Sequence, residues 1–213
     1  MVITFPDGKS REYEKGTRLG DIAKSLSSQL YKKTLSGAVN GETKELFTPV
    51  EEDAQVRFYT FEDEEGRHTL RHTASHIMAQ AVKRLWPDAK LAIGPAIDNG
   101  FYYDIDTEKR FSEEDFAAIE AEMKKIIKEN YPLERFELSR EEALRFVRER
   151  GEDYKVELIE DLPEDAVISF YRQGEFVDLC AGPHLPSTGR AKQIKLMSVA
   201  GAYWRGDEKN KML

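Results

Sequence analysis

The sequence predicts an α+β fold in two parts, a small β-grasp unit followed by a larger unit in which a mostly antiparallel sheet packs on a long helix. The first 60 residues alternate short β-prone runs with one helical pattern, and Asn40-Gly41 between two of these runs is a strong hairpin signal. Helical periodicity over residues 67–85 predicts the long helix, which ends before Pro87. Strand patterns and shorter helical patterns follow it, and they give the larger unit its α+β character.

The first unit begins with a hairpin, because strand patterns over residues 2–5 and 11–14 flank the turn Pro6-Asp7-Gly8. Thr17 is placed to cap a helix over residues 18–28, whose apolar residues recur at helical spacing. A hairpin, one helix and further short strands make up a β-grasp layout. The further strands are expected over residues 37–40, 43–46 and 55–59.

An acidic run at residues 62–66 marks the expected boundary between two domains, 1–62 and 63–213. In the second domain, Ser112 and Ser139 each precede an amphipathic pattern as an N-cap. The expected helices cover residues 67–85, 112–130, 140–150 and 153–160. The expected strands are two within 91–105, and others over 133–137, 167–172, 175–180 and 193–204.

Composition excludes several classes of protein. Apolar residues make up 40% of the chain, which is enough to bury a core and excludes disorder throughout. No run approaches the ~20 apolar residues of a membrane-spanning helix, and the N-terminus lacks a signal-peptide pattern. The single cysteine rules out an internal disulfide and indicates a reducing, cytoplasmic setting. The net charge of −8 argues against a polybasic nucleic-acid clamp, but not against a local basic face that binds RNA.

Three histidines lie on consecutive turns of the long predicted helix. His68, His72 and His76 are spaced four residues apart, so they project from one side of the helix, nearly opposite its apolar stripe. This placement weakens the interpretation of core histidines and leaves two others, an exposed polar face or a functional site.

The fourth histidine lies near the only cysteine. Strand alternation places Asp178 and Cys180 on one face, and the turn at Gly182-Pro183 can bring His184 back beside Cys180. Together with the helix, this segment supplies three imidazoles and one thiol. Such a set can bind zinc tetrahedrally, and it can also line a metal-free hydrolytic pocket.

The runs that contain these residues resemble the editing domain of threonyl-tRNA synthetases. Residues 91–104 and 201–207 carry the same resemblance, and the first 60 residues look like the TGS domain that precedes the editing domain in bacterial members. Alanyl-tRNA synthetases and their free-standing relatives share the histidine and cysteine pairs, but lack a TGS-like unit and the 201–207 run. The two central runs are Arg71-His72-Thr73-Ala74-Ser75-His76 and Asp178-Leu179-Cys180-Ala181-Gly182-Pro183-His184.

The resemblance implies a hydrolase that removes serine from mischarged seryl-tRNA(Thr) as proofreading in translation. Serine lacks one methyl group of threonine, and a synthetic pocket discriminates a missing methylene by only ~1–3 kcal/mol. The aminoacyl ester is already activated, so the site mainly positions a water and stabilises the oxyanion. The chain is then expected to be an N-terminal part of a threonine–tRNA ligase, ending in the linker to an absent class II aminoacylation domain.

Five residues are catalytic candidates by this resemblance. His72 is expected to position or activate the water, and Lys155 to bind that water or the developing negative charge. Cys180 is expected beside the substrate side chain, where it helps to refuse the methyl group. His76 and His184 are expected as pocket walls and hydrogen-bond partners.

Four further residues are expected to bind substrate. Asp178 is expected to pair with the α-amino group, a charge-assisted contact. Gly94, Pro95 and Tyr103 are expected to line the adenosine and aminoacyl site. His68 falls outside the family pattern and is interpreted as exposed.

No cofactor is expected for editing, and the alternative is a Zn²⁺ ion held by His72, His76, Cys180 and His184. ATP, Mg²⁺ and Zn²⁺ are expected only for the absent aminoacylation domain. The expected partner is the 3′ end of tRNA(Thr) carrying serine, with no DNA and no membrane. Members of the family are homodimers through domains outside this chain, which leaves a monomer open here. Two other functions also stay open, a zinc-binding deacylase of the alanyl-tRNA editing type and a non-catalytic tRNA-binding module.

Overall fold

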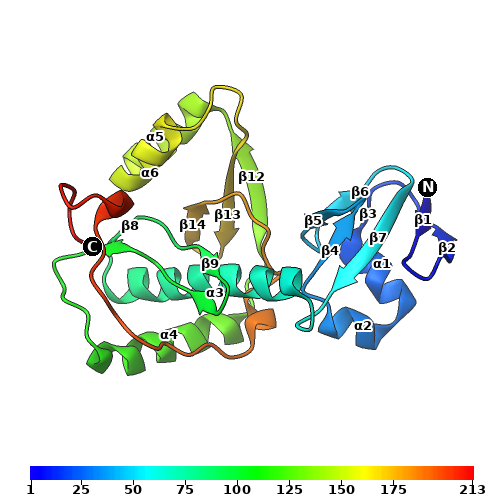
Figure 1. Cartoon of the computed structure of the whole chain (residues 1–213), viewed down its shortest axis with the longest axis horizontal. Coiled ribbons are helices and arrows are strands. Elements are labelled where there is room, and N and C mark those ends of the chain that lie inside the picture. Colours follow the sequence, from blue (N-terminus) through cyan, green and yellow to red (C-terminus); the bar gives the residue numbers. More distant parts are fainter. The chain divides into compact units, whose positions relative to one another are not determined.

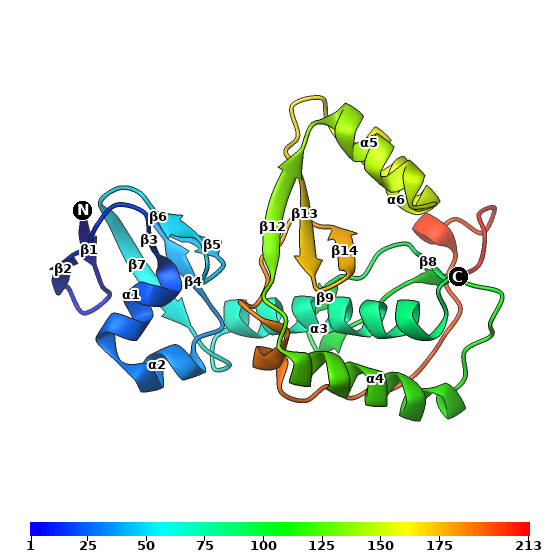
Figure 2. The same cartoon turned by 180° about the vertical axis from the view of Figure 1, so that it is seen from behind.

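The structure is a computed structural model that describes residues 1–213. It divides into two compact units, the first made of residues 1–73 and 182–186 and the second of residues 74–181 and 187–213. Both combine helices with sheets, which confirms the predicted α+β class (Figures 1 and 2). None of the helices combines the length and the apolar composition needed to cross a lipid bilayer.

The first unit is built on a five-stranded sheet with the order β2-β1-β7-β4-β5. Helices α1 (Leu19–Leu26) and α2 (Ser28–Lys33) lie on one side of this sheet (Figure 1). Apolar residues of the sheet and of α1 form its core, among them Ile3, Leu19, Ile22 and Val56. The strands are β1 (Val2–Thr4), β2 (Ser10–Glu12), β4 (Ser36–Val39), β5 (Glu42–Lys44) and β7 (Ala54–Tyr59), with a separate pair β3 (Thr17–Arg18) and β6 (Pro49–Val50).

Turn chemistry explains the predicted hairpins of the first unit, but one predicted cap is wrong. Asn40 and Gly41 take positive φ values of 51° and 82°, as a two-residue turn between β4 and β5 requires. Thr17 does not cap α1, because its hydroxyl donates to the carbonyl of Glu14 and Arg18 occupies the N-cap position. Helix α2 was not predicted, and Ser27 caps it by accepting a hydrogen bond from the Leu30 amide.

The second unit holds a three-stranded antiparallel sheet with the order β12-β13-β14. Helices α5 (Arg140–Glu149) and α6 (Asp153–Glu160) pack on one face of it through a core that includes Val147, Ile159 and Phe170. Helix α3 (Glu64–Leu85) begins in the first unit and continues into the second, where α4 (Phe116–Glu129) runs beside it (Figure 2). The strands are β12 (Glu134–Leu138), β13 (Ile168–Gln173) and β14 (Phe176–Leu179).

Two short antiparallel pairs lie between α3 and α4 in the sequence. β9 (Ala96–Ile97) pairs with β10 (Gly100–Phe101) around a turn at residues 98 and 99, and β8 (Lys90–Leu91) pairs with β11 (Ile105–Asp106) outside it. The predicted cap at Ser139 is confirmed by a reciprocal capping box with Glu142. Ser112 forms the same motif with Asp115 at the short helix η1 (Glu113–Asp115), directly before α4.

The predicted strand over 193–204 is wrong. Residues 192–202 carry no regular structure, between the short helices η2 (Thr188–Ala191) and η3 (Trp204–Gly206). The segment joins no sheet, and Met197 remains 79% exposed. Only its end pairs, where Tyr203 forms an isolated antiparallel bridge with Met212. One of its amides, that of Leu196, donates to the carboxylate of Glu120 on α4 instead of to a strand.

Candidate active site

The three histidines of α3 differ in exposure. His68 is exposed, as predicted, His72 is half-buried, and His76 is only 2% exposed. The neighbouring Thr73 and Ser75 are buried as well, so this part of α3 is covered almost all round. His72 and His76 therefore do not belong to a solvated polar face of the helix.

In the first unit, His72 has a fixed orientation and a defined proton position. Its Nδ1 lies 3.1 Å from the carbonyl oxygen of Pro183. A carbonyl only accepts, so this hydrogen bond requires the proton on Nδ1, and Nε2 of the neutral ring carries the lone pair. His72 can thus accept a proton at Nε2 while the protein holds its other nitrogen.

His184 packs against the ring of His72 and is held by Thr73. The two rings stack with their centroids 4.1 Å apart and an interplanar angle of 27°. The hydroxyl oxygen of Thr73 lies 2.9 Å from His184 Nδ1, and it accepts a hydrogen bond from the amide of Leu185 at the same distance. Thr73 is fully buried, so this hydroxyl anchors the segment that carries His184 to the helix.

In the second unit, Asp178 forms the centre of a buried polar cluster with Tyr103, Lys155 and His76. Its Oδ1 lies 2.9 Å from Lys155 Nζ, and its Oδ2 accepts a hydrogen bond of 2.5 Å from the hydroxyl of Tyr103. The Nε2 of His76 lies 3.6 Å from the same Oδ2. The alternation predicted for β14 is correct here, since Phe176 and Asp178 are buried and lie on the face opposite Val177 and Leu179.

Lys155 uses all three of its N–H donors inside the protein. Its ammonium lies 2.7 Å from the carbonyl of Ala92 and 3.0 Å from the hydroxyl of Tyr103, in addition to Asp178. It therefore contacts a water or an oxyanion only after it exchanges one of these acceptors.

The charges of this cluster set the ionisation of its members. Burial by itself raises the pKa of the Asp178 carboxyl, but the Lys155 ammonium and then His76 outweigh it, and the pKa lies below its usual value. Burial, and next the charge of Asp178, raise the pKa of the Tyr103 hydroxyl well above its usual value. Asp178 is therefore an anion and Tyr103 a neutral donor.

Gly94 supports this cluster by giving room to Tyr103. A Cβ atom at Gly94 would lie 2.1 Å from Cδ2 of the Tyr103 ring, so only glycine allows the ring its position. The carbonyl of Gly94 accepts a hydrogen bond of 2.8 Å from the hydroxyl of Ser75 on α3. Pro95 lies at the base of the β9–β10 hairpin, where its carbonyl accepts a hydrogen bond from the Tyr102 amide.

Cys180 follows β14, and its main chain is held on both sides by Ser169 of β13. The Cys180 amide donates to the Ser169 carbonyl at 3.0 Å, and the Ser169 hydroxyl donates to the Cys180 carbonyl at 2.5 Å. The thiol is half-buried and forms no disulfide.

Of the four expected zinc ligands, His72 and His184 belong to the first unit, and His76 and Cys180 belong to the second. Three imidazoles and one thiol are a donor set that zinc binds, so the residue types fit a zinc ion. The ring geometry fits less well, because imidazole binds a metal in the plane of its ring. Two rings that stack nearly parallel do not place one ion in both planes until one of them turns.

Several supporting groups escaped prediction. Thr73 and Ser75 lie inside the run that carries the resemblance, and their small hydroxyls between histidines were the available signal. Glu152 lies one turn before Lys155, and burial, followed by the charge of Asp178, raises the pKa of its carboxyl. The sequence gives no sign that the Ala92 carbonyl accepts a hydrogen bond from Lys155, because every residue has a backbone carbonyl.

Two family models match the chain at its two ends. Residues 1–60 match the TGS domain, and residues 168–213 match the threonyl and alanyl tRNA synthetase second additional domain. The chain thus combines a TGS domain with an editing domain of this type, as the motifs predicted.

Curated relatives extend this similarity to the whole chain. The threonine–tRNA ligase of Caldanaerobacter subterraneus is 66% identical over 213 residues, and that of Clostridium acetobutylicum is 65% identical over 213. The threonine–tRNA ligase of Clostridium tetani is 65% identical over 211 residues, or 99% of this chain. The chain spans 33% of the length of each of these relatives. It corresponds to the N-terminal region of bacterial threonine–tRNA ligases.

Proposed function

We propose that this chain hydrolyses the ester that joins serine to the 3′-terminal adenosine of tRNA(Thr), within a longer threonine–tRNA ligase. The proposal is supported by the editing-type domain and by whole-chain identity to proteins named threonine–tRNA ligase. The observation that carries it is His72, whose Nδ1 is held by a carbonyl so that Nε2 is the basic atom. A positioned imidazole is suited to take a proton from water.

His72 accepts the proton of the attacking water at Nε2, directly or through a ribose hydroxyl. The bond between the serine carbonyl carbon and the ribose oxygen then breaks, and the imidazolium returns its proton to that leaving oxygen. The stack with His184 fixes the plane of the His72 ring and thereby the direction of its lone pair. Because a well-oriented water supplies most of the rate for an activated ester, no acyl-enzyme on Cys180 is needed.

Asp178 binds the α-ammonium group of the substrate in this proposal. It is a buried anion that already faces Lys155 and Tyr103, so the substrate ammonium shares the carboxylate with Lys155. Lys155 then has a donor to release toward the water or the developing oxyanion. Cys180 stands beside the substrate side chain and disfavours the additional methyl group of threonine.

The test is deacylation of seryl-tRNA(Thr) by the purified chain and by His72→Ala. We expect the variant to lose about 10²–10⁴-fold in rate, the usual contribution of a general base, with an unchanged unfolding temperature. His68→Ala is the matched control, since it removes an exposed imidazole one turn earlier on the same helix and is expected to keep full activity. Equal rates for His72→Ala and the unmodified chain would overturn the proposed role.

A zinc-dependent deacylase is the second candidate, because the chain supplies three imidazoles and one thiol, a donor set that zinc binds. A bound zinc ion would supply an acidified water, and the four side chains would hold it. Metal content by mass spectrometry and unfolding temperature with and without a chelator separate the two candidates. We expect no stoichiometric zinc and no change in unfolding temperature, whereas one zinc per chain with a chelator-sensitive transition would favour the second candidate.

The wider setting is proposed from the relatives alone. We propose tRNA(Thr) as the partner, the cytoplasm as the location, and ATP-dependent threonylation as the work of the longer protein. The domain boundary at residue 62 is part of the same proposal.

A further inference from the structure

Next to the buried cluster around Asp178 lies an acceptor that the proposed hydrolysis does not use. The Oε2 atom of Glu152 is buried, and no protein group forms a hydrogen bond with it. A buried oxygen without a partner costs stability, and such groups are rare in folded proteins. The charges of Asp178 and Lys155 both act on the Glu152 carboxyl, so this carboxyl lies near the two of them.

The backbone holds Glu152 one turn before Lys155. Gly151 takes a φ of 68°, a left-handed value that glycine adopts freely, and its amide donates to the carbonyl of Arg148 at the end of α5. Glu152 follows as the N-cap of α6, and its carbonyl accepts from the Lys155 amide at 3.0 Å, whereas its side chain caps no amide. Residues three apart lie on the same side of a helix, so the Glu152 carboxyl and the Lys155 ammonium can meet.

Two other cations act on Glu152, but each is engaged elsewhere. The Nζ atom of Lys83 donates to two backbone carbonyls of the segment that follows α3, at 2.7 and 2.8 Å. The guanidinium group of Arg150 lies 5.2 Å from the centre of the Phe146 ring. Lys155 is therefore the cation best placed to use the free acceptor of Glu152.

We infer that Glu152 is a positioning residue of the proposed hydrolysis, whose carboxyl accepts a hydrogen bond from Lys155 when the α-ammonium group of the substrate pairs with Asp178. The inference rests on the proposed function. Substrate binding places two cations on one buried carboxylate, and a second acceptor offsets the cost. The three N–H bonds of an ammonium turn together, so a turn that brings one of them to Glu152 releases another from Ala92 or Tyr103 for the water.

This role depends on the charge of the substrate amino group. Without that ammonium, Lys155 keeps its three present acceptors, and Glu152 has no part in the reaction. An ordered water is the competing partner of the Glu152 oxygen, and it would act on substrates with and without an ammonium group alike. A substrate that lacks the amino group therefore separates the two interpretations.

The experiment compares two esters of tRNA(Thr), the seryl ester and the 3-hydroxypropanoyl ester, which is serine without its ammonium group. Each ester is offered to the unmodified chain, to Glu152→Met and to Glu152→Gln. Methionine removes the acceptor but keeps an unbranched side chain of similar length, whereas the amide oxygen of glutamine still accepts from Lys155. Glu149→Met is the matched control, since it makes the same change at an exposed residue of α5.

We expect Glu152→Met to release serine about 10-fold more slowly, the effect of one hydrogen bond to a charged group. The same variant is expected to hydrolyse the 3-hydroxypropanoyl ester at the rate of the unmodified chain. Glu152→Gln is expected to release serine within about 3-fold of that chain, because its hydrogen bond to Lys155 is kept. The unfolding temperature of Glu152→Met should be equal or higher, since an unpaired buried oxygen is removed. Glu149→Met is expected to change neither rate.

Three results would overturn the inference. They are unchanged serine release by Glu152→Met, equal slowing of the two esters in that variant, and a loss in Glu152→Gln as large as in Glu152→Met. Unchanged serine release by Glu152→Met contradicts only the role of Glu152, whereas no serine release by the unmodified chain contradicts the proposed function itself.

Discussion

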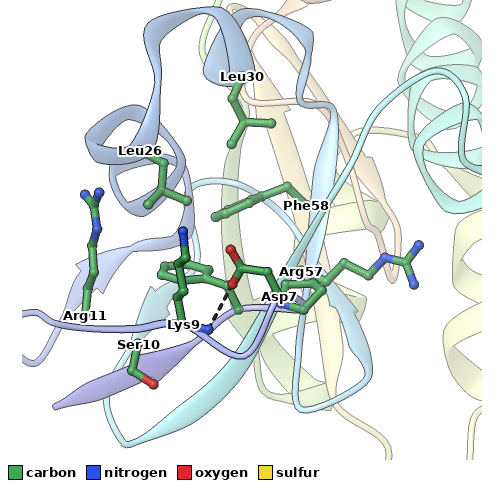
Figure 3. Close-up of a pocket in the computed structure, with 10 residues that line it drawn as sticks. Asp7, Lys9, Ser10, Arg11, Leu26, Leu30, Arg57 and Phe58 are labelled. Carbon is green, nitrogen blue, oxygen red and sulfur yellow. Dashed lines mark hydrogen bonds between the residues drawn. The ribbon is translucent and has the colours of Figure 1, made fainter.

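The buried cluster of the second unit and the surface of the first unit hold charged residues in opposite ways. Lys155 and Asp178 are each 4% exposed, and they contact each other and Tyr103. Lys9 and Arg11 are exposed on the surface of the first unit (Figure 3). The same chemical groups are internal partners in one region and solvated donors in the other.

This difference indicates what each region can do. Buried charges lose their hydration, so they persist only with fixed partners, and fixed partners give the orientation that chemistry needs. Exposed cations keep their hydration and their mobility, so they hold no fixed geometry. Reaction is therefore expected at the buried cluster.

The largest expected effect comes from removing one partner of the buried ion pair. Lys155→Met leaves Asp178 buried without a counter-charge, and we expect a loss of about 3–5 kcal/mol in the free energy of unfolding by urea. Lys155→Met with Asp178→Leu is expected to regain most of this stability and still to lack deacylation. As a control, Lys44→Met breaks the solvent-exposed pair with Glu42 and should cost less than about 1 kcal/mol. Equal losses of unfolding free energy in Lys44→Met and Lys155→Met would contradict the claim that the buried ion pair depends more on its partner than the exposed pair does.

A smaller effect is expected where the backbone makes room for the cluster. Gly94→Ala would press a methyl group into the Tyr103 ring, and we expect a loss of about 1–3 kcal/mol together with slower deacylation. Gly100→Ala is the matched control, because a Cβ there meets no atom within 4 Å and should change stability by less than about 0.5 kcal/mol. Unchanged deacylation by Gly94→Ala would show that the position of the Tyr103 ring does not affect the reaction.

The smallest effect is expected at a partly exposed ion pair of the second unit. The hydrogen bond from Arg84 is the main cause that lowers the pKa of Glu175 to about 2. Its stabilisation is therefore fully present above the ordinary value of 4.5 and is lost as the pH falls from there to about 2. The Glu175 side chain is 55% exposed, so solvent screening limits the contribution to about 1 kcal/mol or less.

Thermal unfolding of Glu175→Gln checks this pH dependence. We expect the variant to be less stable than the unmodified chain at pH 7, and the difference to shrink at pH 3. Glu134→Gln changes an exposed glutamate of β12 and is the control, with unchanged stability expected at both pH values. A stability difference between Glu175→Gln and the unmodified chain that is larger at pH 3 than at pH 7 would contradict a lowered pKa of Glu175.

Local chemistry decided which parts of the fold were predictable. The Asn40-Gly41 hairpin and the helix cap at Ser139 depend on neighbouring residues alone, and both were predicted correctly. The strand expected over 193–204 failed because a strand needs a partner edge, which an alternating pattern does not reveal. Helix α2 has six residues and was too short for its periodicity to stand out.

In the candidate site, too, local features were predictable and contacts between distant residues were not. Strand alternation was sufficient to predict that Asp178 lies on the face of β14 opposite Leu179, and the structure buries the Asp178 face. The partners of Lys155 could not be predicted, because Tyr103 and Ala92 lie 52 and 63 residues away along the chain. The roles of the predicted site residues in binding and hydrolysis stay predictions, although the structure brings His76, Tyr103, Lys155 and Asp178 together.

The relative rates of serine and threonine release test the central claim most directly. The purified chain is incubated with Ser-tRNA(Thr) and, separately, with Thr-tRNA(Thr), and the free amino acid is measured over time. Since one methyl group separates the two substrates, we expect serine to be released at least about 10-fold faster. Equal rates, faster release of threonine, or no release of serine would contradict the claim that this chain edits seryl-tRNA(Thr).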